Sequence, residues 1–311
     1  MRSARQRGAA LLMAILTVAL VAAVASAVIA EHGSAVEQLS GRSDQAQARW
    51  LARGAVDWAR NVLEFDLKRA RTSGSDHFGE EWAIRVPATP VDEGDVSGEI
   101  EDQSGRFNIN SLTDNGVADT ATQAIFQRLL ETLRWQPRDA QMLVDAITDW
   151  IDTDSNPASN GAERDWYTNA KQKVMPPNAP IISIKELLAV RGMTNELLEQ
   201  LRPHITALPP SARTINVNTA SAEVLAAYVE KLPLATAQQI ANSRKTLVFG
   251  GVDEFTKLLP TTSSYNASLL SVRSYYFLAT GRARWGDATT HMQVLLFRNG
   301  KRPDILRETL L

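Results

Sequence analysis

The sequence predicts an α+β fold in which a long N-terminal helix packs on an antiparallel sheet that a large all-helical insertion interrupts. Three observations support this prediction. An uncharged run opens the chain, strand-like alternation occurs both early and late, and the middle has apolar residues at helical spacing. Strands on both sides of a helical block are typical of one sheet with an inserted domain.

The N-terminal segment combines a basic start with an apolar run of membrane length. Three arginines precede residues 9–30, which hold no charged side chain. As an α-helix this run is about 33 Å long, enough for a hydrocarbon core of about 30 Å. Basic residues stay on the cytoplasmic side, so we expect the chain after Glu31 to lie in the periplasm, as a single-pass protein of the bacterial inner membrane.

Three interpretations of this segment are open. A secretory signal peptide would be cut near Ala25-Ser26-Ala27, and a plain signal anchor would stay uncut. The third interpretation rests on Gly8, which ends the basic leader directly before the apolar run. This leader resembles that of type IV prepilins, in which a membrane peptidase cuts after the glycine and the new N-terminus is methylated. The resemblance implies that Gly8 is the last leader residue and that Ala9 begins the mature chain.

Met13 stands at the fifth position of the chain that such cleavage would leave. Most pilins and pseudopilins have a glutamate there, which pairs with the N-terminal amine of a neighbouring subunit. A carboxylate inside lipid needs such compensation. A subunit that lacks the glutamate therefore needs no charged partner in a subunit above. Met13 thus suits the end of a filament and resembles the K-type minor pseudopilin of type II secretion. For a plain anchor, Met13 is simply apolar.

Residues 35–71 continue the helical pattern beyond the apolar run. We expect their apolar stripe to pack on the sheet as core. The stripe consists of Trp50, Gly54, Trp58, Val62 and Phe65. Alternation predicts strands at 82–86, 96–103, 274–285, 290–297 and 305–310, with turns at Ser104-Gly105 and Asn299-Gly300. We divide the chain into a leader (1–8), the N-terminal helix (9–71), the first part of the sheet (72–112), the inserted helical domain (113–263) and the remaining strands (264–311).

The insertion contains two similar units, residues 183–203 and 215–244. We expect helices at 118–135, 138–151, 184–205 (two), 221–230, 234–245 and 252–259, with N-caps at Thr194, Thr219 and Ser221. The units resemble helix-hairpin-helix or SAM-like modules, which place hairpin amides on DNA phosphates in nucleic-acid-binding proteins.

The charge of the insertion disfavours a nucleic-acid partner. Residues 113–263 carry more acidic than basic side chains, and the whole chain has a formal net charge of −2. The second hairpin, at Leu234-Ala235-Thr236, also lacks the glycine that lets amides approach a phosphate. We therefore expect protein contact and keep a membrane-anchored DNA-binding or DNA-uptake component as the alternative.

The acidic segment 149–165, which begins in the last turn of the predicted helix 138–151, is the clearest chemical feature. Its oxygen donors are Asp149, Asp152, Asp154, Asn156, Asn160, Glu163 and Asp165. From Asp152 onward they follow EF-hand spacing, but Pro157 stands where that loop needs glycine, so we expect a Ca²⁺ site of another geometry. Hard oxygen donors without histidine or cysteine favour calcium, and the resemblance to the K-type pseudopilin also implies calcium. A solvated acidic surface loop is the alternative.

The sequence indicates a structural subunit and not an enzyme. Cysteine is absent, the four histidines are scattered, and neither a Gly-x-Ser-x-Gly nor a Walker motif occurs. A periplasmic calcium-dependent enzyme stays as a rival. The resemblance implies that the chain caps a short periplasmic filament and helps to begin its assembly. The implied partners are the I, J and H types of minor pseudopilin, the major pseudopilin, the prepilin peptidase and inner-membrane lipid.

Overall fold

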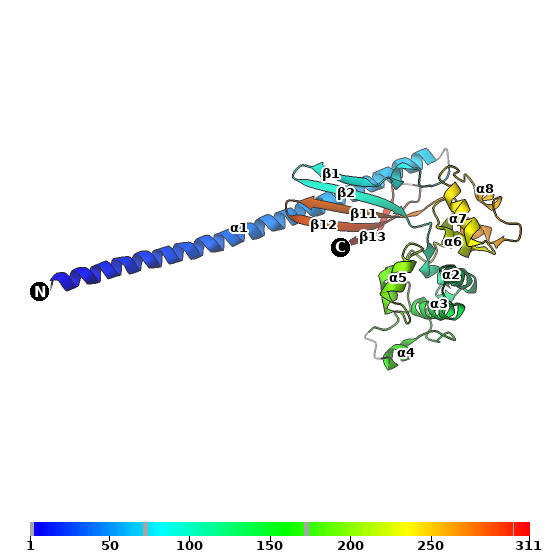
Figure 1. Ribbon diagram of the computed structural model, residues 1–311, viewed down its shortest axis with the longest axis horizontal. Helices are drawn as coiled ribbons and strands as arrows, with labels where there is room; N and C mark the ends of the chain where they lie inside the picture. The colour runs from blue at the N-terminus through cyan, green and yellow to red at the C-terminus, as the bar shows by residue number, and fades with distance from the viewer. Residues whose placement is uncertain (1–2, 71–73, 171–173, 301) are drawn as a thin grey trace.

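The computed structural model describes residues 3–70, 74–170, 174–300 and 302–311. A single helix, α1 (Ser3–Ala70), spans 68 residues, and its N-terminal half stands clear of the rest of the molecule (Figure 1). Within this half, Ala9–Ile29 is long and apolar enough to cross a bilayer, and 0% of it is buried. Nothing in the described protein covers this apolar surface, as expected for a segment whose partner is lipid or another apolar helix.

The C-terminal half of α1 packs on a five-stranded sheet whose strand order is β1-β2-β11-β12-β13. All neighbouring strands are antiparallel. The strands are β1 (Val86–Val91), β2 (Gly94–Asp102), β11 (Tyr276–Trp285), β12 (Ala288–Phe297) and β13 (Asp304–Leu310). The prediction of an antiparallel sheet built from both ends of the chain is confirmed.

Two details of the predicted sheet are wrong. Residues 81–83 form a 3-10 helix, and the first strand begins only at Val86. Ser104 and Gly105 do not close a hairpin, because β2 pairs with β1 on one side and with β11 on the other. The hairpin turn lies instead at Asp92 and Glu93, where Asp92 adopts a positive φ of 50°.

The predicted face of α1 against the sheet is also wrong. Trp50, Trp58 and Phe65 are 71%, 48% and 63% exposed. The buried face consists mainly of small side chains, namely Ala48, Ala52, Val56, Ala59 and Leu63.

A close helix–sheet contact explains why small residues are buried there. A Cβ atom built on Gly281 of β11 would lie 3.2 Å from Ala55 Cβ and 3.3 Å from the Ala52 carbonyl oxygen. An indole has no room in this contact, so the aromatic side chains turn to the open side of α1.

The segment between β2 and β11, residues 103–275, holds the helical insertion, for which the sequence predicts the range 113–263. Its helices are α2 (Thr120–Thr132), α3 (Pro137–Ile151), α4 (Arg164–Asn169), α5 (Asn195–Leu201), α6 (Ala222–Tyr228), α7 (Leu234–Ser243) and α8 (Val252–Thr256), with the 3-10 helix η3 (Ile184–Ala189). The sequence prediction missed only the short α4 among these. The likeness to helix-hairpin-helix units stays a prediction.

Short parallel strand pairs close the insertion. β3 (Phe107–Asn108) pairs with β6 (Ile205–Thr206), and β7 (Ile215–Asn216) pairs with β10 (Leu270–Ser271). The side chains of Thr194 and Ser221 cap α5 and α6 as predicted. The insertion has its own apolar core around Phe107 and Trp150, separate from the core between α1 and the sheet. The helical insertion therefore folds around a core of its own beside the part formed by α1 and the five-stranded sheet.

Candidate functional site

The acidic loop joins α3 to α4. At the end of α3, the Asp152 backbone nitrogen donates to the carbonyl oxygen of Thr148 at 2.8 Å. At the start of α4, the carboxylate of Glu163 accepts from the Arg164 backbone nitrogen at 3.3 Å. The loop is thus held at both ends by helix termini.

Three of the seven predicted ligands converge. One oxygen each of Asp152, Asp154 and Glu163 lies within 4.8 Å of the other two. Asp152 and Glu163 are each only 5% exposed. Asp152 Oδ1 and Glu163 Oε1 are buried and have no hydrogen-bond partner among the described residues. Buried carboxylate oxygens normally have a partner, so this pair favours a cation in the cluster.

The electrostatics of the cluster also favour a cation. Burial, reinforced by the neighbouring carboxylates, raises the pKa of Asp152 to about 7. Burial likewise raises the pKa of Glu163. A divalent cation would lower both pKa values, because positive charge favours the ionised carboxylates.

Two further predicted ligands hold the loop in shape. The Asp149 carboxylate accepts from the Ala158 backbone nitrogen, with distances of 3.1 and 3.2 Å to its two oxygens. Asn160 donates from its backbone nitrogen and from Nδ2 to Asp145 Oδ2, at 3.1 and 3.0 Å. Asp145 is not among the predicted ligands, although it lies one helical turn before Asp149 and so shares its face of α3.

The last two predicted ligands lie at the edge of the loop. Asn156 is exposed, and its backbone nitrogen donates to Asp154 Oδ1 at 2.7 Å. Asp165 is exposed in the first turn of α4. Neither belongs to the three-carboxylate cluster.

Arg191 connects the loop to the segment before α5. Its Nη1 donates to the Gly161 carbonyl oxygen at 2.9 Å, and its guanidinium lies 5.0 Å from the centre of the Trp166 ring. Its backbone nitrogen donates to the Tyr167 hydroxyl at 3.1 Å. A Cβ atom on Gly161 would meet Asp149 Oδ2 at 1.9 Å, so only glycine permits the close approach of loop and helix.

The donor set fits a hard divalent cation. Asp152, Asp154 and Glu163 offer carboxylate oxygens, and the cluster contains no histidine or cysteine. Ca²⁺ takes about six to eight oxygen ligands. Backbone carbonyls and water would therefore have to complete the shell that these residues begin, and the ion would act structurally by joining α3 to α4.

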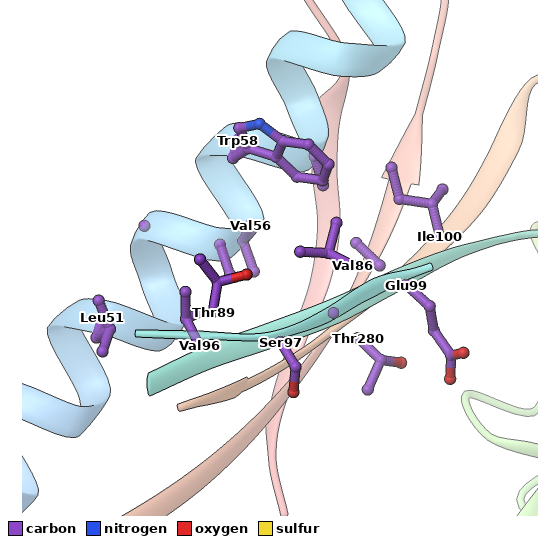
Figure 2. Close-up of a pocket in the computed structure, with 16 residues that line it drawn as sticks. Leu51, Val56, Trp58, Val86, Thr89, Val96, Ser97, Glu99, Ile100 and Thr280 are labelled. Carbon is purple, nitrogen blue, oxygen red and sulfur yellow. The ribbon is translucent and has the colours of Figure 1, made fainter. Parts of the chain in front are cut away.

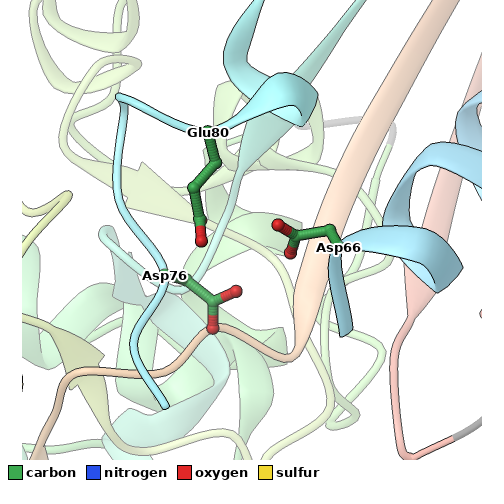
Figure 3. A group of neighbouring side chains, drawn as sticks. All are labelled: Asp66, Asp76 and Glu80. Atoms are coloured by element: carbon green, nitrogen blue, oxygen red, sulfur yellow. The ribbon is translucent and has the colours of Figure 1, made fainter. Parts of the chain in front are cut away.

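A second acidic cluster has its own cation within the protein. Asp66, Asp76 and Glu80 face one another (Figure 3). The guanidinium of Arg298 pairs with Asp66 at 2.6 Å and also with Asp76. Glu80 accepts from the His77 backbone nitrogen and from Trp82 Nε1. Because these partners satisfy the cluster, we interpret it as a structural network and not as a candidate metal site.

An apolar cavity of about 350 Å³ lies between α1 and the β1–β2 edge of the sheet. Figure 2 shows Trp58 on the helix side and Val86, Val96 and Ile100 on the strand side. Trp58 therefore links this cavity to the exposed aromatic stripe of α1. Together they form an apolar surface that the described protein leaves uncovered.

The fold defines a class of protein. A membrane-length apolar helix that continues into an amphipathic helix and packs on an antiparallel sheet is the arrangement of a pilin-like subunit, here with a helical insertion. A chain of the solved GspK-GspI-GspJ complex from the type 2 secretion system of enterotoxigenic Escherichia coli shares this fold. The TM-score is 0.76 at 22% identity, over 88% of this chain and 99% of that chain.

The chain belongs to the type II secretion system protein K family. Two models of that family, both described as Type II secretion system (T2SS), protein K, match residues 105–210 and 215–273. Type II secretion system protein K of Klebsiella pneumoniae is 32% identical over 96% of this chain and 94% of that protein. The relative from Pectobacterium carotovorum subsp. carotovorum, also named Type II secretion system protein K, is 30% identical over 99% of this chain and 97% of that protein.

The chain is thus a minor pseudopilin of type II secretion. This family is a structural one within the secretion system. None of these relatives favours the DNA-binding alternative.

Proposed function

We propose that this minor pseudopilin occupies the tip of the periplasmic filament and helps to begin its assembly. Met13 carries this proposal, because a helix without a carboxylate at that depth needs no amine from a subunit above it. The test counts copies of this chain per filament by quantitative mass spectrometry. We expect a constant small number in filaments of every length, and a count that grows with filament length would contradict the tip position.

The exposed stripe of α1, formed by Trp50, Trp58 and Phe65, is the proposed contact with other minor pseudopilins. Large aromatic side chains exposed along one helix are typical of a protein interface. The stripe lies on the same helix as the membrane segment, so the partner is a helix that rises from the same membrane. The solved relative sits in a complex with GspI and GspJ, and the I, J and H types are the proposed partners here, together with the major pseudopilin.

Co-purification tests this surface. Replacing all three aromatic residues with serine should leave the chain folded, as circular dichroism would show, but abolish co-purification with the other minor pseudopilins. Val117→Ser, which alters a residue that is 67% exposed outside α1, is the matched control and should co-purify normally. Normal co-purification of the triple variant would exclude the stripe as the interface.

The proposed location is the inner membrane, with Ala9–Ile29 as the single span and the rest of the chain in the periplasm. Prepilin peptidase would remove residues 1–8 and leave Ala9 as a methylated N-terminus in contact with lipid. Sequencing of the purified native protein tests this proposal. Ala9 should be the first residue, and a first residue beyond Ser26 would mean a cleaved signal peptide.

Calcium is the proposed ligand of the α3–α4 loop. The unpartnered buried oxygens of Asp152 and Glu163 support this proposal. Calcium should raise the melting temperature of the metal-free chain, and Asp152→Asn with Glu163→Gln should remove that rise. Asp165→Asn changes an exposed acid outside the cluster and should keep it. An unchanged melting temperature with calcium in the unaltered protein would reject the site.

A further inference from the structure

We propose that the junction between the sheet and the helical insertion holds a binding pocket for an acidic segment of a protein partner. A cavity of about 420 Å³ opens there between β2, β13 and the η3–α5 region. Four basic side chains line it, Arg106, Lys185, Arg202 and Arg307, against the single acid Glu101. This inference is independent of the proposed calcium site.

Two of the four cations have an acidic partner and two do not. Arg106 pairs with Glu101 at 2.6 Å, and Arg202 pairs with Glu199. Lys185 and Arg307 make no ion pair within 4.0 Å with any acid in the part of the chain that the structure describes. Arg307 instead donates to the carbonyl oxygen of Ile182. The pocket therefore has an excess of positive charge that an anionic ligand would balance.

Gln103, which also lines this pocket, supplies an independent observation. It is only 4% exposed, and its Nε2 has no hydrogen-bond partner among the described residues. Its Oε1 accepts from Thr206 at 3.0 Å and from the guanidinium of Arg106 at 3.4 Å. A guanidinium can only donate, so the oxygen must face Arg106 and Nε2 is the free donor. Gln103 thus adds a buried donor without an acceptor to a cavity that two cations without an acidic partner also line, and this combination fits a carboxylate ligand.

The lining and the position of the pocket identify the source of the carboxylate. Ile184, Leu278 and Leu295 also line the cavity, so it suits a segment with both acidic and aliphatic side chains. The sheet packs on α1 from Ala48 onward. Ala48 lies about 30 Å along α1 beyond the end of the apolar span, so lipid headgroups cannot reach the pocket.

Equilibrium binding to the full chain in detergent tests the proposal. The probe is the fluorescent peptide Glu-Leu-Glu-Leu with blocked ends, compared with Gln-Leu-Gln-Leu and with inorganic phosphate at equal ionic strength. We expect saturable binding of the acidic peptide only. Lys185→Met with Arg307→Met should weaken it at least about tenfold, because each removes a charged hydrogen-bond donor. Arg307→Lys should retain part of the affinity.

Arg138→Met is the matched control, since Arg138 is exposed and lies outside the pocket. This variant should bind the acidic peptide normally. Equal binding of the glutamine peptide, or unchanged binding by the double variant, would overturn the proposal. Competition by phosphate at the concentration of the peptide would assign the pocket to a free anion and would also overturn it. Circular dichroism of each variant confirms that it is folded.

Discussion

At the scale of single residues, Arg191 has a role that its distance in sequence from the acidic loop conceals. The side chain reaches the Gly161 carbonyl and lies over Trp166, while its backbone nitrogen contacts Tyr167. These contacts join the loop to the chain before α5. Arg191 is therefore a positioning residue for the proposed calcium site and not a ligand.

Arg191→Met should weaken calcium binding by about tenfold, the effect expected when a residue that orients a metal site is lost. Isothermal titration calorimetry measures the affinity, and the melting temperature without calcium shows whether the variant is folded. Arg138→Met should bind calcium as the unaltered chain does. Equal affinity in Arg191→Met would show that the loop keeps its shape without this contact.

Glu80 gives the molecule a pH dependence of stability. Burial, together with the carboxylates of Asp66 and Asp76, raises the pKa of Glu80 to about 7 from an ordinary value of 4.5. A carboxyl group with a raised pKa in the folded state favours folding while it is protonated. Glu80 therefore lowers the free energy of unfolding progressively as the pH rises from about 4.5 to above 7.

Glu80→Gln should remove this dependence, since an amide oxygen can still accept from His77 and Trp82. The free energy of unfolding of the variant minus that of the unaltered chain should be larger at pH 8 than at pH 5 by about 1–2 kcal/mol, a range that allows for screening of a half-buried group. Urea unfolding at the two pH values measures the difference. A constant difference at both values would contradict the assignment.

At the scale of elements, the contact between α1 and β11 decides how the long helix meets the sheet. Gly281 lies opposite Gly98 of β2 and Met292 of β12, directly beneath the helix backbone. The apolar periodicity of α1 alone could not reveal this contact. It indicated an amphipathic helix but assigned the larger aromatic side chains to the core, whereas the close approach admits only small ones.

Gly281→Val should push α1 away from the sheet and lower the free energy of unfolding by about 1–3 kcal/mol, the usual cost of overfilling a packed contact. Gly300→Val is a poor comparison because Gly300 has a positive φ. Thr289→Val is a better control, since it adds a β-branched apolar side chain at an exposed position of β12. Chemical unfolding should show no more than about 0.5 kcal/mol of change for this control.

At the scale of the whole molecule, one buried network joins the main parts of the chain. Arg298, after β12, pairs with Asp66 near the end of α1 and with Asp76 before β1. The backbone nitrogen of Ser274, just before β11, donates to Asp76, and the Asn216 side chain of the insertion donates to the Asp76 carbonyl. The network therefore sets how the helix, the sheet and the insertion meet.

Arg298→Met should lower the free energy of unfolding by about 3–5 kcal/mol, because it leaves buried carboxylates without their cation. Arg284→Met is the control, since the Arg284 side chain is 55% exposed in its pair with Asp95, and its loss should cost less than about 1 kcal/mol. Urea unfolding followed by tryptophan fluorescence measures both. Adding Asp76→Asn to Arg298→Met should restore part of the stability.

The sequence by itself determined the membrane-length apolar segment, the helical insertion between strands and the position of the acidic loop. Each depends on residues that are neighbours in the chain, where composition, periodicity and turn residues act locally. Only the tertiary structure decided which face of α1 is buried, and that Asp152, Asp154 and Glu163 converge while Asp149 and Asn160 hold the loop. It alone also brought Arg191 to that loop and placed Arg307 and Gln103 in the lining of one cavity. Such contacts join residues far apart in the chain, and close packing between whole elements, which no local pattern encodes, sets their geometry.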